Sequence, residues 1–389
     1  MHDPFPLAPP AYLVPYAEKL AGYLSMQTLP LHFHEVIVAY AIYHGTNTYV
    51  SPVFSRYFFP RTYNSLNART KLNWDVHIVS FVQSVLICGL ALWVMWVDTE
   101  RHVMDTKERV HGYTGASGLI QAFAGGYFLW DLVITVKHVR IFGIGMLFHA
   151  ISALCVFSLG FRPFVNYYAS TFILYELSSP FLNIHWFCDK LNMTGSTLQF
   201  VNGIFLLFTF FTCRLCWGTY HSFRVFADVY RAYAAGPVTL ADVETGKLNS
   251  TTIVGNAGFK HDVLAFAEGQ TVPLWLAAAY LASNITLNGL NWFWFGKMIE
   301  TLRKRFDPPL GTRRPEVKEP GLVVPEADKV MIEGTHVLTP AAVEMDDADY
   351  LGTGNGASPA VKLDRSSSGT HLEVSASEVR SRASTRRRG

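Results

Sequence analysis

Six ionisable side chains stand inside long apolar stretches of this sequence, and these residues could carry chemistry. They are Asp75, His77, Asp131, His149, Glu176 and Arg214. A charged side chain inside a bilayer is costly, so each is expected to be paired within a helix bundle or to belong to a functional path. Glu176 and Arg214 carry opposite charges on successive apolar stretches. This leaves two interpretations open: an ion pair joining two helices, or a direct role in a lipid site.

His149 lies among Leu147, Phe148, Ala150 and Ile151. Such an apolar setting favours a neutral imidazole, which can serve as a general base or donate one hydrogen bond across a helix bundle. Nothing in the spacing of residues supports a Ser-His-Asp set, a phosphate-binding loop or a metal site, and no cofactor is expected.

Asparagines form a second polar group. Asn284, Asn288 and Asn291 recur at helical spacing and predict a polar stripe that either joins helices or lines a cavity. Asn183 lies near the end of an apolar stretch, where an interfacial cap is one explanation.

The elements that must position these groups are membrane helices. Half of the 389 residues are hydrophobic and only 16% are charged, which indicates a lipid-facing exterior. Apolar stretches near twenty residues long match the length that crosses a bilayer core of about 30 Å. The sequence therefore predicts an all-α, polytopic transmembrane bundle of about seven helices. Its spans are a weak one at 31–50 and stronger ones at 74–97, 117–136, 141–161, 163–187, 198–217 and 272–295.

Three regions follow from this pattern. Residues 1–69 form an N-terminal segment with the weak membrane helix, residues 70–300 form the transmembrane domain, and residues 301–389 form a disordered cytosolic tail, because their Pro, Gly, Ser, Thr and charged residues cannot bury enough apolar surface. The basic end of the tail, SRASTRRRG, could contact anionic headgroups. The net charge of +2 gives no support to a nucleic-acid partner. The segment HSFRVFADVYRAYAA after Tyr220 either lies at the membrane interface or extends the preceding helix.

Loop charges predict the orientation. Basic residues precede the second span and follow the last one, so both regions are expected on the cytosolic side. The Asn-Ser-Thr sequon at Asn249 would then face the lumen. The five cysteines are too few and scattered for a disulfide framework.

Five segments resemble the TLC-domain family, which includes the ceramide synthases. They are NWDVHIVSFVQS at 73–84, GYFLWDL at 126–132, GMLFHAI at 145–151, ELSSPFLN at 176–183 and NGIFLLFTFFTCR at 202–214. The resemblance covers about 70–300 and is closest to members that stand apart from ceramide synthases. It implies a protein of the endoplasmic reticulum membrane that acts in lipid homeostasis by sensing, binding or regulating membrane lipid acyl composition. A membrane lipid would be its partner, with Glu176, Asn183, Arg214, Asn284 and Asn288 as lipid-binding residues.

Two alternatives remain open. Ceramide synthases carry paired histidines on the fourth helix and a following acidic stretch, whereas here the pair is reduced to Phe148-His149 and the acidic motif is missing. If acyl transfer survives, the resemblance implies that His149 is the base and that Asp131 orients it or charges the site. The other alternative is a membrane scaffold or trafficking adaptor that acts through the tail.

Overall fold

The computed structural model describes residues 1, 3–239, 242 and 263–303, and in this part of the chain the regular elements are all helices. The helices belong to one compact unit, and a second unit, Met345–Gly389, lies wholly outside the described residues. The predicted disorder of the tail beyond Arg303 and the sequon at Asn249 also lie outside the described residues. The all-α helix bundle predicted from the sequence is confirmed.

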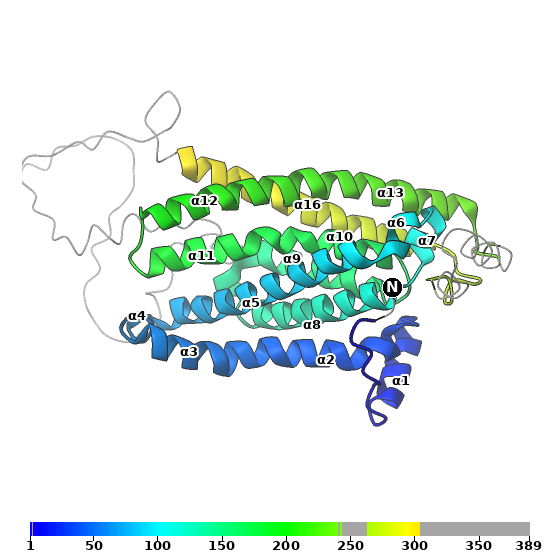
Figure 1. Ribbon diagram of the computed structural model, residues 1–389, viewed down its shortest axis with the longest axis horizontal. Helices are drawn as coiled ribbons and strands as arrows, with labels where there is room; N and C mark the ends of the chain where they lie inside the picture. The colour runs from blue at the N-terminus through cyan, green and yellow to red at the C-terminus, as the bar shows by residue number, and fades with distance from the viewer. Residues whose placement is uncertain (2, 240–241, 243–262, 304–389) are drawn as a thin grey trace, which may run out of the picture. The chain divides into compact units, whose positions relative to one another are not determined.

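Long helices run side by side (Figure 1). In chain order, the α-helices are α1 (Val14–Leu24), α2 (Leu29–Gly45), α3 (Ser51–Phe58), α4 (Pro60–Ser65), α5 (Ala68–Val97), α6 (Thr99–Val103), α7 (Thr106–His111), α8 (Gly115–Lys137), α9 (Val139–Leu159), α10 (Ala169–Phe172), α11 (Ser179–Lys190), α12 (Thr197–Thr209), α13 (Gly218–Ala235) and α16 (Leu274–Arg303). Two π-helical turns, η1 (Thr46–Val50) and η4 (Phe210–Trp217), and two 3-10 turns, η2 (Asn166–Tyr168) and η3 (Ile173–Ser178), link some of them.

Within the described part of the chain, four helical stretches are long and apolar enough to cross a membrane. They are Ala68–Val97, Thr106–Lys137, Val139–Leu159 and Thr197–Ala235. The predicted number of about seven spans is not confirmed by this criterion. The thirty residues of α5 extend over about 45 Å, so this helix reaches well beyond a hydrocarbon core of about 30 Å.

Local sequence explains where the central helices begin. The Asn67 side chain accepts a hydrogen bond from the Thr70 amide at the start of α5, and the Thr114 hydroxyl accepts one from the Ser117 amide at the start of α8. These side chains satisfy amides that have no partner within the helix. The observed starts lie before the predicted ones because a cap places the first turn ahead of the apolar stretch.

The weak helix predicted at 31–50 packs closely against α8. It forms α2 and continues through η1 into α3. A Cβ added at Gly126 of α8 would lie 2.6 Å from the Cβ of Ala39 and 2.7 Å from the carbonyl oxygen of Val36, so only glycine permits this approach. Small residues allow helix backbones to come this close in membranes. Packing thus supports a helix whose composition alone is ambiguous.

The predicted span at 163–187 is not one regular helix. It is divided into η2, α10, η3 and α11, and Pro180 stands in the first turn of α11. A proline cannot donate its amide and crowds the carbonyl four residues earlier, which here belongs to Glu176. The chain accordingly runs as a 3-10 turn before Pro180, and Glu176 lies in that turn.

The sixth predicted span is longer than expected. α12, η4 and α13 form a continuous helical stretch, Thr197–Ala235, so the aromatic and basic segment after Tyr220 extends the helix. This outcome matches the second of the two alternatives for that segment.

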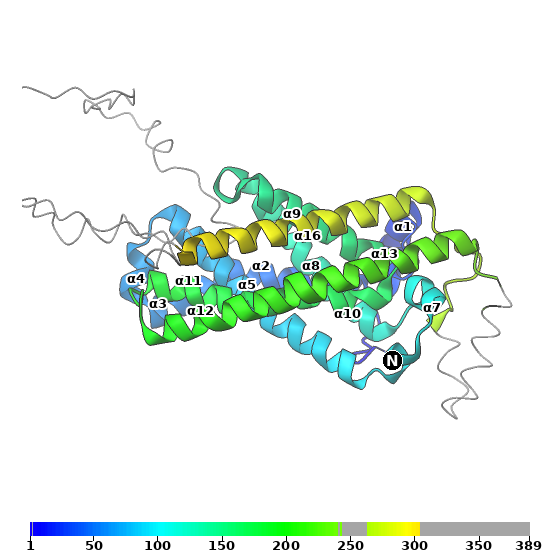
Figure 2. The same cartoon turned by 90° about the horizontal axis from the view of Figure 1, so that it is seen from above.

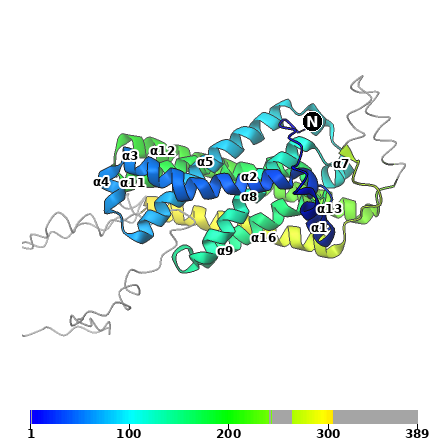
Figure 3. The same cartoon turned by 90° about the horizontal axis from the view of Figure 1, so that it is seen from below.

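The two ends of the bundle differ. Figures 1 and 2 show α3, α4 and the start of α5 at the same end as the last turns of α16. These segments carry the two basic regions that the loop charges predict on one side. At the other end, α1 runs across the direction of the long helices (Figures 1 and 3). Tyr16 and Tyr23 of α1 and Tyr12 just before it are exposed.

Candidate functional site

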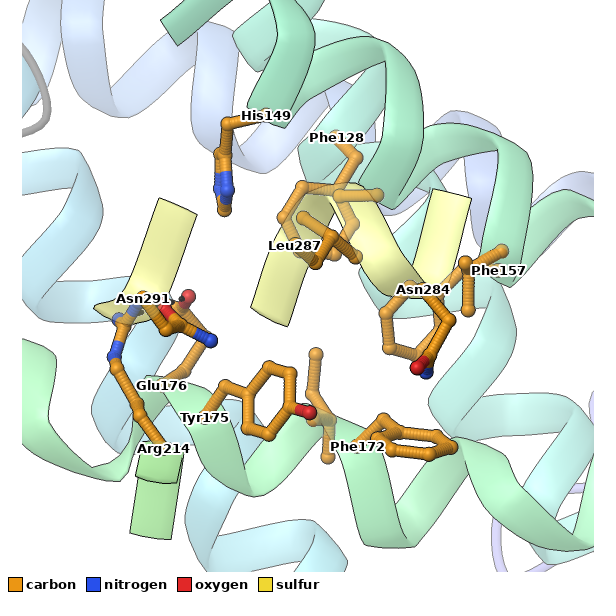
Figure 4. A pocket seen from close by; sticks show the side chains of 13 residues that line it. Phe128, His149, Phe157, Phe172, Tyr175, Glu176, Arg214, Asn284, Leu287 and Asn291 are labelled. Carbon is orange, nitrogen blue, oxygen red and sulfur yellow. Dashed lines mark hydrogen bonds and ion pairs between the residues drawn. The ribbon is translucent and has the colours of Figure 1, made fainter. Parts of the chain in front are cut away.

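A small cavity of about 20 Å³ lies among the central helices (Figure 4). Its walls come from α8, α9, α10, η3, η4 and α16. The lining residues are Phe128, His149, Ala153, Val156, Phe157, Phe172, Ile173, Tyr175, Glu176, Arg214, Asn284, Leu287 and Asn291. A volume of this size holds about one water molecule. A larger ligand therefore requires the lining side chains to move apart.

Arg214 is the centre of the polar wall. Its Nε donates to the Ser178 hydroxyl at 2.9 Å, one terminal nitrogen donates to the Asn291 side-chain oxygen at 3.1 Å, and the other donates to the Ser179 hydroxyl at 3.1 Å. The second terminal nitrogen also lies 3.5 Å from a carboxylate oxygen of Glu176. Because both charged side chains are buried, this pairing compensates part of the cost of removing them from water.

Glu176 is held from two sides. Its other carboxylate oxygen accepts a hydrogen bond from the Ser179 hydroxyl at 2.8 Å. Ser179 therefore connects both charged groups, donating to Glu176 and accepting from Arg214. The buried ion pair that the sequence left as one interpretation is present, and it also lines a cavity.

Arg214 lies in a locally irregular part of its helix. The residue lies in the π-helical turn η4, a helix variant that occurs often at functional sites. Just after this turn, a Cβ added at Gly218 would lie 2.4 Å from the Tyr175 ring. Glycine at this position therefore lets the η4–α13 stretch approach η3, which carries Tyr175 and Glu176.

The asparagine stripe of α16 divides into two roles. Asn284 and Asn291 line the cavity, whereas Asn288 does not. The Asn288 amide donates to the Ser222 hydroxyl at 2.8 Å and to the Asn284 side-chain oxygen at 3.0 Å, so it joins α16 to α13. Both alternatives for the stripe, helix joining and cavity lining, apply to different members of it.

His149 lines the cavity opposite the ion pair (Figure 4). Its ring contacts Phe128 and Trp294, with ring centroids 6.1 Å and 5.6 Å away. The buried Nδ1 has no hydrogen-bond partner among the residues that the structure describes. The imidazole therefore keeps one nitrogen available for a bound molecule, whether as a hydrogen-bonding group or as a base.

Asp131 and Asn183 lie outside the cavity wall. Asp131 is buried on α8, near enough to Glu176 for their charges to interact. Asn183 accepts a hydrogen bond from the His77 ring at 2.6 Å and donates to the Ser80 hydroxyl at 3.1 Å, so it fastens α11 to α5. The candidate residues brought together at the cavity are thus His149, Glu176, Arg214 and Asn284.

Two polar cavity residues are absent from the predicted lipid-binding set, although Asn291 belongs to the predicted asparagine stripe. Asn291 accepts from Arg214, and its place seven residues after Asn284 was the signal that could have selected it over Asn288. Tyr175 donates to Asn288 at 3.4 Å and also lines the cavity. Nothing in its sequence neighbourhood separates it from the other aromatic residues nearby.

The arrangement joins an apolar wall to a polar one. Phe128, Val156, Phe157 and Phe172 offer aromatic and aliphatic surface, while Arg214, Glu176, Asn284 and Asn291 offer donors and acceptors. The chemistry of this lining, rather than its present volume, matches a molecule that is mostly hydrocarbon and carries one polar group. Its lining contains no set of carboxylates and histidines arranged as metal ligands among the described residues.

Known proteins are similar in sequence to this chain over most of the helix bundle. A family model described as the TLC domain matches residues 73–300. A TLC domain-containing protein of Schizosaccharomyces pombe is 35% identical over 300 residues, which cover 77% of this chain and 87% of the relative. Topoisomerase I damage affected protein 4 of Saccharomyces cerevisiae is 27% identical over 299 residues, covering 75% of this chain and 92% of the relative. TLC domain-containing protein 4 of Homo sapiens is 28% identical over 156 residues, covering 39% of this chain and 58% of the relative.

Proposed function

This chain belongs to the TLC-domain family, and we propose that it binds a membrane lipid inside its helix bundle and acts in lipid homeostasis at the endoplasmic reticulum membrane. The cavity that joins the Arg214–Glu176 pair to an apolar wall supports this function most directly. The bound lipid is expected to place hydrocarbon against Phe128, Phe157 and Phe172 and its polar group near Asn291.

The chemistry of the polar wall selects the kind of lipid. The Glu176 carboxylate compensates the charge of Arg214, and the Arg214 donors already have partners in Ser178, Ser179 and Asn291. Binding a phosphate there would require Arg214 to leave these partners, whereas an ester, amide or hydroxyl group needs only one or two hydrogen bonds. We therefore expect an uncharged acyl lipid rather than an anionic phospholipid headgroup.

A matched pair of substitutions on α16 tests the proposal. Leu287→Trp places a large ring in the cavity, whereas Ile285→Trp places the same ring on the exposed face of the same helix. Lipids that copurify with the full chain in detergent are identified and quantified by mass spectrometry. The wild type and the Ile285 variant should be enriched in the same lipid class, and the Leu287 variant should lose at least about nine-tenths of it.

Two results would contradict the proposal. One is a wild-type protein without any enriched lipid class. The other is equal lipid content in the Leu287 and Ile285 variants while both remain folded and monodisperse. Helical content by circular dichroism and elution volume establish that the variants are folded.

One observation favours a second function, acyl transfer of the ceramide synthase type. His149 lines the cavity with its Nδ1 unpartnered among the described residues, and in that reaction it would remove the proton of an attacking amine. Asp131, which the resemblance implies would orient the base or charge the site, does not line the cavity. Transfer from an acyl-coenzyme A to a sphingoid base by the wild type, with at least a hundredfold loss in His149→Gln, would establish the enzyme; lipid binding without turnover would favour the binding protein.

A further inference from the structure

Three metal-ligating side chains meet at the end of the bundle that carries the N-terminus. Asp3 lies in the N-terminal segment, and His32 and Glu35 lie one turn apart on α2. One ligand atom from each residue lies within 4.8 Å of the other two. His32 and Glu35 are buried, and Asp3 is partly buried.

The charges of this cluster call for a cation. Glu35 contacts His32, which offsets part of its charge, and it lies within hydrogen-bonding reach of the Asp3 carboxylate. Among the described residues no lysine or arginine pairs with either carboxylate. A divalent ion between two carboxylates and a neutral imidazole would leave the group with no net charge. Coordination is a common way to compensate buried carboxylates.

The second ring nitrogen of His32 has the contact expected of a metal ligand. Nδ1 lies 2.6 Å from Glu35, and Nε2 lies 2.6 Å from the Tyr113 hydroxyl. A histidine that binds a metal through one nitrogen usually donates a hydrogen bond from the other. His32 would bind through Nδ1 as the tautomer protonated at Nε2, which donates to the Tyr113 hydroxyl.

The neighbouring helix is shaped to admit this cluster. A Cβ added at Gly118 of α8 would lie 2.3 Å from His32 Nε2, and one added at Gly115 would lie 2.4 Å from the Asp3 amide nitrogen. Two glycines, one turn apart, thus leave room for the two cluster residues that approach α8. This close fit is an observation independent of the donor types.

We propose that Asp3, His32 and Glu35 form a binding site for a divalent transition-metal ion of the zinc class, which fastens the N-terminal segment to the α2–α8 contact. Zn²⁺ accepts both imidazole and carboxylate ligands, and the imidazole favours a transition metal over Ca²⁺ or Mg²⁺. This proposal does not depend on lipid binding in the central cavity.

The test measures metal content and metal affinity of the full chain in detergent. Elemental analysis counts the metals retained after purification, and Co²⁺ titration followed by visible absorption reports coordination by the protein. The wild type is expected to bind one equivalent of Zn²⁺ or Co²⁺ and to unfold at a higher temperature with Zn²⁺ than without it.

Asp3→Asn is the decisive variant. It removes a charged ligand, while its side-chain oxygen can still accept the 2.8 Å hydrogen bond from the Phe5 amide. Affinity should fall at least tenfold in Asp3→Asn and in Glu35→Gln. His34→Gln is the matched control, because His34 is a buried histidine of the same helix outside the cluster, and it should bind like the wild type.

Several outcomes would overturn the proposal. They are a wild type that binds no stoichiometric Zn²⁺ or Co²⁺, a wild type that binds only Ca²⁺ or Mg²⁺, and an Asp3→Asn variant with unchanged affinity. A variant that fails to fold is replaced in the comparison by Tyr113→Phe, which keeps all three ligands and should weaken Co²⁺ binding by removing the hydrogen bond to His32 Nε2.

Discussion

Two arginine–carboxylate pairs of this bundle differ in how many hydrogen bonds join the two charged groups directly. Arg109 of α7 contacts both carboxylate oxygens of Asp228 on α13, at 2.7 Å and 3.0 Å, and Asp228 also accepts from the Tyr168 hydroxyl at 2.7 Å. Arg214 contacts Glu176 at only 3.5 Å, shares its donors with three neutral side chains and lines a cavity.

This difference separates a pair that only joins two helices from a pair that can also contact a ligand. A closed two-point contact is the strong geometry for arginine and carboxylate, and it leaves little to offer a third group. The looser pair around Arg214 has neighbours that can exchange partners when a ligand enters. We therefore expect the Arg109–Asp228 pair to serve stability and the Arg214–Glu176 pair to serve the proposed lipid site.

Breaking the Arg109–Asp228 pair should have the largest effect on stability. Asp228→Asn removes the negative charge that Arg109 and Tyr168 share, leaving a mostly buried arginine without its counter-ion. We expect a loss of about 3 kcal/mol in the free energy of unfolding, measured in mixed micelles. The lipid content of the protein that remains folded should be unchanged; a fall in lipid content would show that this pair also serves the cavity.

The matched change at the Arg214–Glu176 pair should lower the free energy of unfolding by a smaller amount. In Glu176→Gln, Arg214 keeps Ser178, Ser179 and Asn291 as partners. We expect a loss of about 1.5 kcal/mol in unfolding free energy, together with at least a tenfold loss of the copurified lipid. If Glu176→Gln lowers stability as much as Asp228→Asn and leaves the lipid content normal, the Arg214–Glu176 pair only stabilises the fold.

Double-mutant cycles sharpen the same distinction. The cycle of Arg109→Gln with Asp228→Asn should give a coupling free energy of about 2–3 kcal/mol, and the cycle of Arg214→Gln with Glu176→Gln should give less than about 1 kcal/mol. Urea or detergent unfolding of the four proteins in each cycle provides the values. Equal couplings would mean that distance and bonding pattern do not separate the two pairs.

The smallest stability effect is expected at His149. His149→Gln removes a ring whose Nδ1 has no hydrogen-bond partner among the described residues, so unfolding free energy should change by less than about 1 kcal/mol. Lipid affinity or lipid selectivity should change instead, measured by competition between ester, amide and hydroxyl lipids. Identical selectivity in wild type and variant would remove His149 from the site.

The sequence predicted the helical stretches well because their signals are local. Apolar stretches near twenty residues long and caps such as Asn67 depend on residues close together in the chain. The irregular fifth segment was harder, although Pro180 marks its break, since the length of the 3-10 turn depends on what packs around Glu176.

The site could be predicted only in part. Asn284 and Asn288 are one turn apart on a helix that is apolar on nearly every side, so no contrast between faces shows which residue points inward. The resemblance implied a lipid-binding role for Asn183, yet its side chain contacts α5. Only packing against η3, η4 and α13 separates the lining residues from those that join helices.

By itself, the sequence determined that this chain is a bundle of apolar helices of the TLC-domain family and which few polar residues lie within it. Tertiary structure alone decided which of them meet, such as Arg214 with Glu176 and Asn291, or Asp3 with His32 and Glu35. The physical reason is that helix formation depends on hydrogen bonds and apolar surface within one stretch of chain. Contacts between helices depend instead on close-packing positions such as Gly118 and Gly126, whose effect appears only when the neighbouring helix is in place.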